Sequence, residues 1–326
     1  MNARKLLKMG WDVSDLTSRP KDDSTEILRK QVLTGQTLSL ITTQEGIKYK
    51  EKIKLFDVDV VWQDGATCGF TASGDAKFSD REIEVKSVKL QMSFCNLDLI
   101  EKWTRDALAA GSIAELEDFP YEDILIGYLN EKNAWELDKA LWRGDTALSS
   151  GNFQFFDGFE KLFDTESANM IDINTQGAIA INSTNAYDVF YNAYSDYLND
   201  DTGAAILETG EAIAMVTRQQ FLALIKDIVD SNKFHFNPAE ATGNGQFILP
   251  GTDLNIVMIK GRNDNNKFYI GRPSSLRFGT DLASDTDEVK IWYENKDEAI
   301  LVSIRFKGGV QVPFPEEIGY FELAAS

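Results

Sequence analysis

The feature that most constrains the fold is an alternation of apolar and charged residues with a period of two in GIKYKEKIKL, residues 46–55, interrupted only at Glu51. A period of two is typical of a β-strand, because successive side chains of a strand point to opposite faces. The phase shifts by one residue in FDVDVVW, residues 56–62, and this shift predicts a bulge or a bend. The apolar positions are Ile47, Tyr49, Ile53 and Leu55 before the shift, and Phe56, Val58, Val60 and Trp62 after it.

The chain is then expected to turn and come back. Residues 63–75, QDGATCGFTASGD, contain Asp-Gly and Gly-Asp pairs that favour tight turns, and residues 81–95 have a second strand pattern. Together they predict a long ribbon. A two-stranded ribbon is only marginally stable alone in water, so its apolar side chains need another surface. A neighbouring subunit is one candidate, and an ordinary antiparallel sheet inside a larger domain is the other.

A long helix is predicted for residues 120–143. Pro120 suits its first position, and the two acidic residues that follow complement the positive end of the helix dipole. The apolar residues fall on two faces, so we expect the helix to be packed on more than one side. One face has Ile126, Leu129, Leu137 and Leu141, and the other has Ile124, Tyr128, Trp135 and Trp142.

The tripeptide Arg143-Gly144-Asp145 follows at the end of this helix. It matches a cell-adhesion signal, but such a signal needs an exposed loop tip. Lys139 and Arg143 lie where positive charge is favoured, and Gly144 suits the left-handed residue that closes a helix. We therefore interpret the tripeptide as helix termination.

The rest of the chain is mixed. Residues 1–35 have too little apolar surface to fold alone, so an arm is expected, with a short helix over 23–33 and a basic start at Arg4, Lys5 and Lys8. The pattern becomes strand-like from Gln36. Helices and strands alternate in the second half, which indicates an α+β or α/β class. Helices are predicted over 97–110, 185–198 and 217–232, and Thr217 is expected to cap the last of them. Strands are predicted over 211–216, 253–261, 267–272, 288–294 and 299–314. A turn is expected at 262–266, between two of these strands, and a bend at Gly308-Gly309.

Composition narrows the classes of function that the protein can have. The 326 residues, 43% of them hydrophobic, allow one large or two ordinary domains. With 52 acidic and 33 basic residues the net charge is −19, which argues against a nucleic-acid reader but not against a protein that encloses nucleic acid. The two cysteines, Cys68 and Cys95, favour a reducing compartment. The sequence has neither a signal-peptide pattern nor a membrane-length apolar run, so a soluble protein made in the cytoplasm is expected.

Catalytic chemistry is not indicated. The single histidine, His235, lies between two phenylalanines and is interpreted as structural. GNGQFI, residues 243–248, lacks the third glycine of a dinucleotide fingerprint, so a loop is predicted there. The run Asp281, Asp285, Asp287 and Glu288 lacks the spacing of a calcium loop and is interpreted as a solvated loop. The sequence therefore predicts no catalytic residue, no cofactor and no metal, and a protein that is not an enzyme.

Taken in order, four segments resemble the major capsid proteins of tailed bacteriophages, which have the Hong Kong 97-type fold. The order and spacing carry the resemblance, rather than any single motif. The segments are residues 72–90, residues 140–163, residues 211–228, and the closing strands over 270–294 and 302–321. The resemblance implies an α+β fold with an N-terminal arm (1–35), an extended β-hairpin loop (36–82), a peripheral domain (83–175 and 278–316) with a spine helix (120–143), and an axial domain (176–277 and 317–326).

The resemblance also implies a function. Such a protein assembles with copies of itself as hexamers and pentamers into an icosahedral shell of the virion, around double-stranded DNA that it contacts without sequence specificity. Portal, scaffolding or decoration proteins are further implied partners, and a membrane is not. Because the ribbon begins near residue 36, the long scaffolding segment of some members does not fit.

Some questions stay open at this point. Some members crosslink a lysine to an asparagine of another subunit; Lys48, Lys50, Lys52 and Lys77 lie in the ribbon, but no partner residue can be matched. An encapsulin-type compartment shell and, in another class, a soluble acidic hydrolase or sugar-binding domain remain alternatives.

Overall fold

The computed structural model describes residues 35–65, 69, 73–95, 121–174, 179–231, 245–281, 289–294 and 299–323. Several expectations fall elsewhere. The helices predicted over 23–33 and 97–110, the basic residues Arg4, Lys5 and Lys8, and His235 lie outside the described residues.

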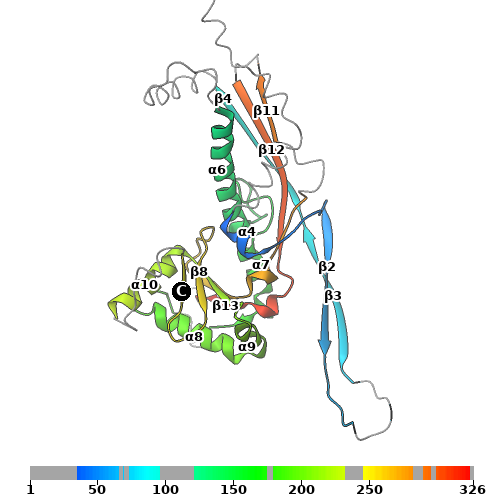
Figure 1. Cartoon of the computed structure of the whole chain (residues 1–326), viewed down its shortest axis with the longest axis vertical. Helices are drawn as coiled ribbons and strands as arrows, with labels where there is room; N and C mark the ends of the chain where they lie inside the picture. Colours follow the sequence, from blue (N-terminus) through cyan, green and yellow to red (C-terminus); the bar gives the residue numbers. More distant parts are fainter. Residues whose placement is uncertain are drawn as a thin grey trace, which may run out of the picture.

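The molecule is elongated, and a ribbon of two strands leaves the body partway along its length and projects beyond it (Figure 1). The body has two sheets. One lies along the long helix α6 (Tyr121–Arg143), and the other is covered by the helices α8 (Ala186–Asn199), α9 (Asp201–Glu208) and α10 (Arg218–Asp230). The fold class expected from the sequence, α+β, is therefore confirmed.

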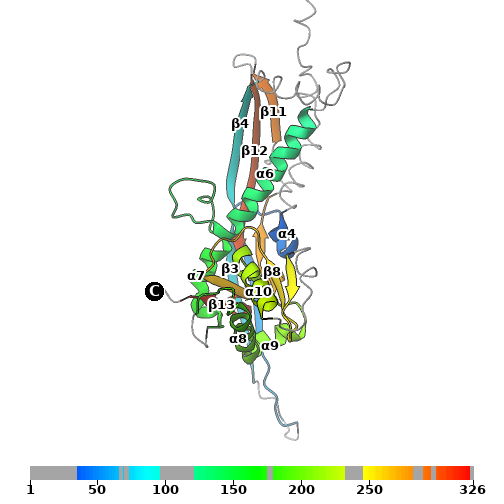
Figure 2. The ribbon, with the colours of Figure 1, turned by 90° about the vertical axis from the view of Figure 1, so that its left-hand side faces the viewer.

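The first sheet is centred on the long strand β12 (Ala299–Gln311). Its neighbours are β4 (Lys86–Cys95), β11 (Val289–Glu294) and β10 (Arg277–Gly279), and β10 pairs in turn with β1 (Thr42–Gln44). Figure 2 shows α6 running along β4, β11 and β12. Leu137, Leu141 and Trp142 of α6 are buried in one cluster with Val302, Ile304 and Phe306 of β12.

The second sheet has six strands within the described residues. Their order is β5 (Ile171–Asp172), β13 (Gly319–Glu322), β9 (Lys267–Gly271), β6 (Ile213–Val216), β8 (Asn255–Met258) and β7 (Gln246–Ile248). The predicted turn over 262–266 does connect β8 to β9, but β6 lies between these two strands. They are therefore not a hairpin.

Alternation along the strands divides the interior into two cores. In β6, Ala214 and Val216 pack with α8, α9 and α10, whereas Met215 points to the opposite side and packs with α6 and α7 (Phe159–Glu166). Each side of this sheet is thus covered by helices. This explains why the strands in its centre read as short apolar runs.

The expected helices and strands of the second half are largely in place. Thr217 caps α10, as predicted, and it does so in a capping box with Gln220. In α8, Val189, Ala193 and Tyr197 are buried. GNGQFI is not wholly a loop, because Gln246–Ile248 forms the edge strand β7. The remaining short elements are α4 (Gln36–Leu40) and single 3-10 turns at Ser167–Asn169, Pro273–Ser275 and Pro315–Glu317.

The strand-like interpretation from Gln36 is wrong at its start, because Gln36–Leu40 is the helix α4. It is held against α6, where the amide of Thr37 donates to Asp138 Oδ1 at 2.9 Å and Trp142 Nε1 donates to Thr37 Oγ1 at 2.8 Å. The secondary structure of this segment thus depends on side-chain partners far away in the sequence. Local alternation of apolar and polar residues contains no information about those partners.

At Gly308-Gly309 strand β12 changes partner. It pairs with β4 up to Gly308 and with β10 from Gly309 onward. A Cβ on Gly309 would lie 2.0 Å from the carbonyl oxygen of Glu84, so the glycine is needed for a close approach of two backbones. The predicted bend remains a prediction.

Candidate assembly surface

The projecting ribbon consists of β2 (Lys50–Asp59) and β3 (Asp75–Glu84), and it is the main candidate for a functional surface. Its register runs without interruption from Lys50 opposite Glu84 to Asp59 opposite Asp75. The bulge predicted from the shift of phase is therefore wrong. The strand stays regular because neither of its outer faces is covered by the body there, and no core selects a single apolar face.

The base of the ribbon is fixed to the body. Ile47, Ile83 and Val85 form a small buried cluster, and a Cβ on Gly279 would lie 2.8 Å from Ile83 Cδ1. Arg81 forms an ion pair with Glu166 of α7 at 2.9 Å. The return strand predicted over 81–95 divides at Val85, where β3 ends and β4 enters the first sheet. The ribbon is thus a direct extension of the body's sheet.

The register assigns the outer part of the ribbon two different faces. Phe56 lies opposite Phe78, with ring centroids 4.6 Å apart, and Val58 lies opposite Ala76 on the same face. Phe56 is 58% and Phe78 79% exposed, and Trp62 beyond the strand is 94% exposed. Within the described residues the two strands have no third strand as a partner. We call Phe56, Val58, Val60, Trp62 and Phe78 the apolar ribbon face.

Closer to the body, the same side of the ribbon becomes ionic. Lys50 lies 2.6 Å from Glu82 and 3.1 Å from Glu84, and Lys52 lies 2.6 Å from Asp80. The hydrogen bond with Glu82 raises the pKa of Lys50, and the bond with Asp80 raises the pKa of Lys52. These pairs are exposed, so they contribute little to stability. They border the apolar ribbon face with paired charges.

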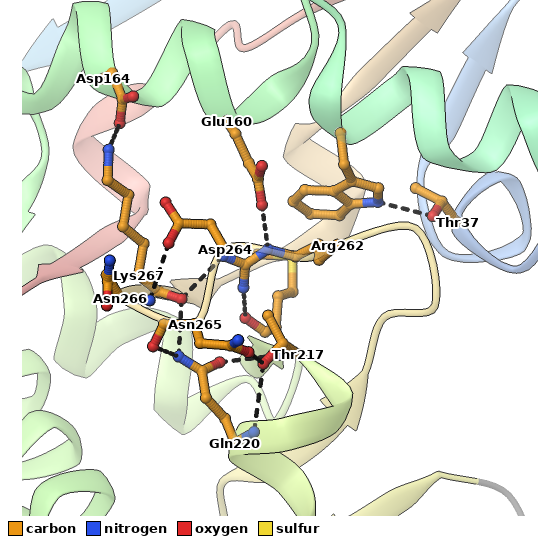
Figure 3. A network of polar contacts seen from close by, with 12 residues as sticks. Thr37, Glu160, Asp164, Thr217, Gln220, Arg262, Asp264, Asn265, Asn266 and Lys267 are labelled. Atoms are coloured by element: carbon orange, nitrogen blue, oxygen red, sulfur yellow. Dashed lines mark hydrogen bonds and ion pairs between the residues drawn. The ribbon is translucent and has the colours of Figure 1, made fainter. Parts of the chain in front are cut away.

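A second cluster of polar contacts lies around Arg262, between α7 and the second sheet (Figure 3). The guanidinium donates to Glu160 Oε1 at 2.9 Å, to the carbonyl oxygen of Met215 at 2.5 Å, and to that of Lys267 at 2.9 Å. It also lies 4.6 Å from the ring centre of Tyr269. Its side chain is fully buried. One residue therefore joins α7, β6 and β9.

The capping box of α10 connects to the same point. Gln220 Nε2 donates to the carbonyl oxygen of Lys267 at 3.0 Å, the oxygen that also accepts from Arg262. Thr217 Oγ1 lies 2.6 Å from Asn265 Oδ1 (Figure 3). The turn over 262–266, expected from the sequence only as a connection, is thus the junction of two helices, α7 and α10, and two strands, β6 and β9.

The electrostatics of this junction are those of a buried ion pair. Burial raises the pKa of Glu160, and the charge of Arg262 opposes that shift. An open depression of about 360 Å³ lies beside it, lined by Trp142, Arg143, Gly144, Asp145, Glu160, Lys161, Asp164, Asn263 and Asp264. Lys161 there is held between Asp145 at 2.5 Å and Asp157 at 2.8 Å. Groups paired in this way hold the structure together and do not form a nucleophile–base pair.

The Arg143-Gly144-Asp145 tripeptide lies at the end of α6, as expected, but Gly144 is not left-handed. Its need for glycine is steric, since a Cβ would lie 2.3 Å from the carbonyl oxygen of Phe156 and 2.9 Å from the amide of Gly158. Asp145 is tied to Lys161. The tripeptide is therefore part of a closed loop against the body.

Other residues singled out in the sequence have ordinary roles. Asp281 is buried and forms an ion pair with Lys307, so the solvated-loop interpretation is wrong for that residue; residues 282–288 are outside the described part. Trp142 is buried as expected, whereas Trp135 is 44% exposed. Among the described residues there is no cluster of potential metal ligands. The helices of that part of the chain are too short or too polar to cross a bilayer.

Comparison with known proteins identifies the fold. No protein-family profile and no curated sequence matches this chain. A chain of the capsid of a native GTA particle superposes with a TM-score of 0.57 at 13% identity, over 91% of each chain. A chain of the satellite phage P4 procapsid that includes the size determination (Sid) protein gives 0.55 at 11% identity, over 91% of this chain and 98% of that one.

The capsid of Myoviridae phage XM1 gives a TM-score of 0.53 at 11% identity, over 99% of this chain and 98% of that one. These likenesses extend over nearly the whole length of both chains. The protein therefore has the fold of phage capsid chains, which confirms the fold implied by the sequence resemblance.

Proposed function

We propose that this protein is a major capsid protein, which assembles as hexamers and pentamers into an icosahedral shell around double-stranded DNA. The observation that carries the proposal is the apolar ribbon face. Phe56, Phe78 and Trp62 are mostly exposed on a structure of only two strands, fixed to the body by its base. Large apolar side chains exposed together in this way mark an interaction site. A neighbouring copy of the same chain is the occupant that a shell protein supplies.

Repetition of one contact explains how such a shell closes. When a projecting segment of one subunit lies on a different surface of the next, the contact is heterologous, and its rotation generates a ring. The ribbon is suited to this role because its base is packed against the body, whereas the apolar side chains farther out are not covered by the body. The likeness to capsid chains of the GTA particle and of phage XM1 supports this use of the fold.

The charge of the chain suits a container for DNA. A net charge of −19 keeps packaged DNA from adhering to the shell wall, so contact with the nucleic acid is not sequence-specific. Portal, scaffolding or decoration proteins are the other partners that a head of this kind uses. The protein is made in the host cytoplasm and resides in the virion.

The division into parts also belongs to this proposal. Residues 1–35 act as the arm and 36–82 as the extended loop. Residues 83–175 and 278–316 form the peripheral domain with the spine helix 120–143, and residues 176–277 and 317–326 form the axial domain. The second interior cluster lies almost wholly within residues 176–277 and 317–326 and supports an axial unit, whereas the first cluster contains residues of both units.

The test is to express the full chain and to examine it by size-exclusion chromatography and negative-stain electron microscopy. Rings of five or six subunits, or shells, are the expected result. A stable monomer at high concentration, with or without a bound small ligand, contradicts the proposal. The nucleic acid and protein content of purified particles separates a DNA-filled head from a compartment that holds cargo protein.

A further inference from the structure

Helix α8 carries a row of three tyrosines and a leucine that its own fold covers only in part: Tyr187 and Tyr194 are half-buried, and Tyr191 and Leu198 are exposed. Tyr187, Tyr191, Tyr194 and Leu198 follow one another at intervals of four, three and four residues, so they lie on one side of the helix. Tyr191 is 42% and Leu198 44% exposed. The rings are in contact, with centroids 6.0 Å apart for Tyr187–Tyr191 and 6.5 Å for Tyr191–Tyr194. We call these four residues the tyrosine face.

The tyrosine face is held in place from one side. Tyr187 Oη donates to the carbonyl oxygen of Pro250 at 3.0 Å, and Tyr194 Oη donates to Asp253 Oδ1 at 3.0 Å. Both acceptors lie in the connection between β7 and β8. Because their hydroxyl groups are already bonded, these rings lose little conformational freedom when another surface covers them. Ordered tyrosines of this kind are frequent at the centres of protein interfaces.

The surroundings of the tyrosine face are acidic. No lysine or arginine occurs between Lys161 and Arg218, and Asp188, Asp201 and Asp253 are exposed around the row. A surface that packs here must therefore supply apolar side chains in the middle and positive charge at the edge.

Helix α10 presents a surface with that composition. Leu222 is 53% and Val229 44% exposed, and the exposed residues Arg218 and Lys226 lie on the same side of the helix. We call these four residues the α10 face. In a chain of net charge −19, an exposed helix side with two cations is a local exception.

The tyrosine face and the α10 face point in different directions on the subunit. Asp227 Oδ2 accepts from the amide of Tyr187 at 2.9 Å, so α10 turns its Asp227 side toward α8. At about 100° per residue, Leu222 and Val229 lie roughly 140° and 160° away from Asp227 around the helix. The tyrosine face instead adjoins the connection between β7 and β8. A subunit can therefore offer one face to each of two neighbours.

We propose that the tyrosine face of one copy packs against the α10 face of the next copy, in a head-to-tail contact that closes a ring. This inference rests on the proposed function, since it names the contact between the α8–α10 layers of adjacent subunits in a capsomer. Leu222 and Val229 cover the tyrosine rings, and Arg218 and Lys226 meet the acidic border. The contact is heterologous, as ring closure requires.

The experiment is a crosslink between assembled copies. Tyr191→Cys and Leu222→Cys are combined in a chain in which Cys68 and Cys95 are replaced by serine, and the particles are oxidised. On a non-reducing gel the double variant is expected to give a ladder up to the size of the ring. Each single-cysteine variant is expected to remain a monomer, because in a head-to-tail contact the same face never meets itself.

A substitution tests the same contact without new cysteines. Leu222→Asp is expected to reduce the yield of rings at least tenfold, whereas Ile179→Asp, at a site 54% exposed and outside both faces, leaves it unchanged. Intact rings without a ladder, or dimers of the Tyr191→Cys variant alone, overturn this inference but leave the proposed function standing. Failure of the unmodified chain to form any ring overturns the proposed function itself.

Discussion

Arg262 and Gly144 show how single residues hold this fold together. Arg262 is buried between α7 and the second sheet and satisfies two backbone carbonyl groups and a carboxylate. Gly144 lets the end of α6 come within reach of residues 156–158, where the amide of Gly158 donates to the carbonyl oxygen of Gly144 at 2.8 Å. Neither requirement can be read from the sequence, because both depend on partners brought close only by the folded chain.

Replacement of Arg262 by methionine is expected to lower the free energy of unfolding by about 3–5 kcal/mol at neutral pH, because Glu160 is left buried and unpaired. The deficit should be smaller in acid. Burial raises the pKa of Glu160 from 4.5, so the folded state holds that proton more tightly. The resulting stabilisation is present below the ordinary pKa and is lost as the pH rises through the folded value.

Urea unfolding of the Arg262→Met variant at pH 5 and pH 8 measures this difference. Arg305→Met, at an exposed arginine, serves as the control and should change little. Addition of Glu160→Gln to Arg262→Met should recover part of the loss at pH 8. An equal deficit at both pH values would show that Glu160 is not the group responsible.

Alanine at Gly144 is expected to destabilise the protein by about 1–3 kcal/mol, because its Cβ collides with the backbone of residues 156–158. Gly65→Ala is the matched control, since a Cβ there has no atom within 4 Å. The melting temperatures of the two variants provide the comparison. If both melt like the parent chain, the close approach at Gly144 is not a constraint.

At the scale of elements, the sequence predicted most segments with a strong period. The helix expected over 120–143 is α6, and the alternating residues near 50 form β2. The prediction failed where the secondary structure of a segment depends on residues that are distant in the sequence. Gln36–Leu40 is a helix because Asp138 and Trp142 bind Thr37, and residues 81–95 divide because Val85 belongs to the cluster at the ribbon base.

The candidate surfaces were only half predictable for the same reason. Alternation and turn residues alone predicted a ribbon whose apolar side chains need another surface. The tyrosine face did not, because the positions of Tyr187, Tyr191 and Tyr194 beside a buried row at Ala186, Phe190 and Ala193 read as one wide apolar side of α8. Only the folded structure shows which of the two rows is covered.

Substitution of both ribbon phenylalanines, Phe56→Ser with Phe78→Ser, is expected to leave the melting temperature of the unassembled subunit within a few degrees of the parent. Both side chains are largely exposed, so their loss creates no cavity. Assembly into rings and shells should fail, as judged by size-exclusion chromatography. Lys77→Ser, on the other face of the same ribbon, is the control and should assemble. Normal shells from the double variant would exclude the apolar ribbon face from assembly.

At the scale of the whole molecule, the structure places its three candidate contact surfaces on two separate parts. The apolar ribbon face projects from the base of the first sheet, and the tyrosine and α10 faces belong to the helices that cover the second (Figure 1). One core cluster contains residues of both sheets, such as Val302 of β12 and Met215 of β6, so a neighbour bound at one part is positioned relative to a neighbour bound at the other. A closed shell with a defined curvature needs such a fixed relation between contacts.

Limited digestion with chymotrypsin is expected to separate free from assembled subunits. Trp62 is 94% and Phe78 79% exposed, so the free chain should be cut after these residues first. In shells the same bonds should be protected, because neighbours cover the ribbon. Mass spectrometry of the fragments reads out both cases, and Trp62→Ser should remove one of the two early products. Equal cleavage in both states would mean that the ribbon stays uncovered.

The direct continuation of the ribbon into β4 has a mechanical consequence. Strand β4 is paired with β12 over ten consecutive positions, from Lys86 opposite Gly308 to Cys95 opposite Ala299. Antiparallel hydrogen bonds are perpendicular to the strands, so a pull on the ribbon along β4 loads all of them together in shear instead of unzipping them one by one. Tension that a neighbour exerts on the ribbon, for instance when internal pressure stretches the wall, is thus spread through the sheet and does not peel the strand away.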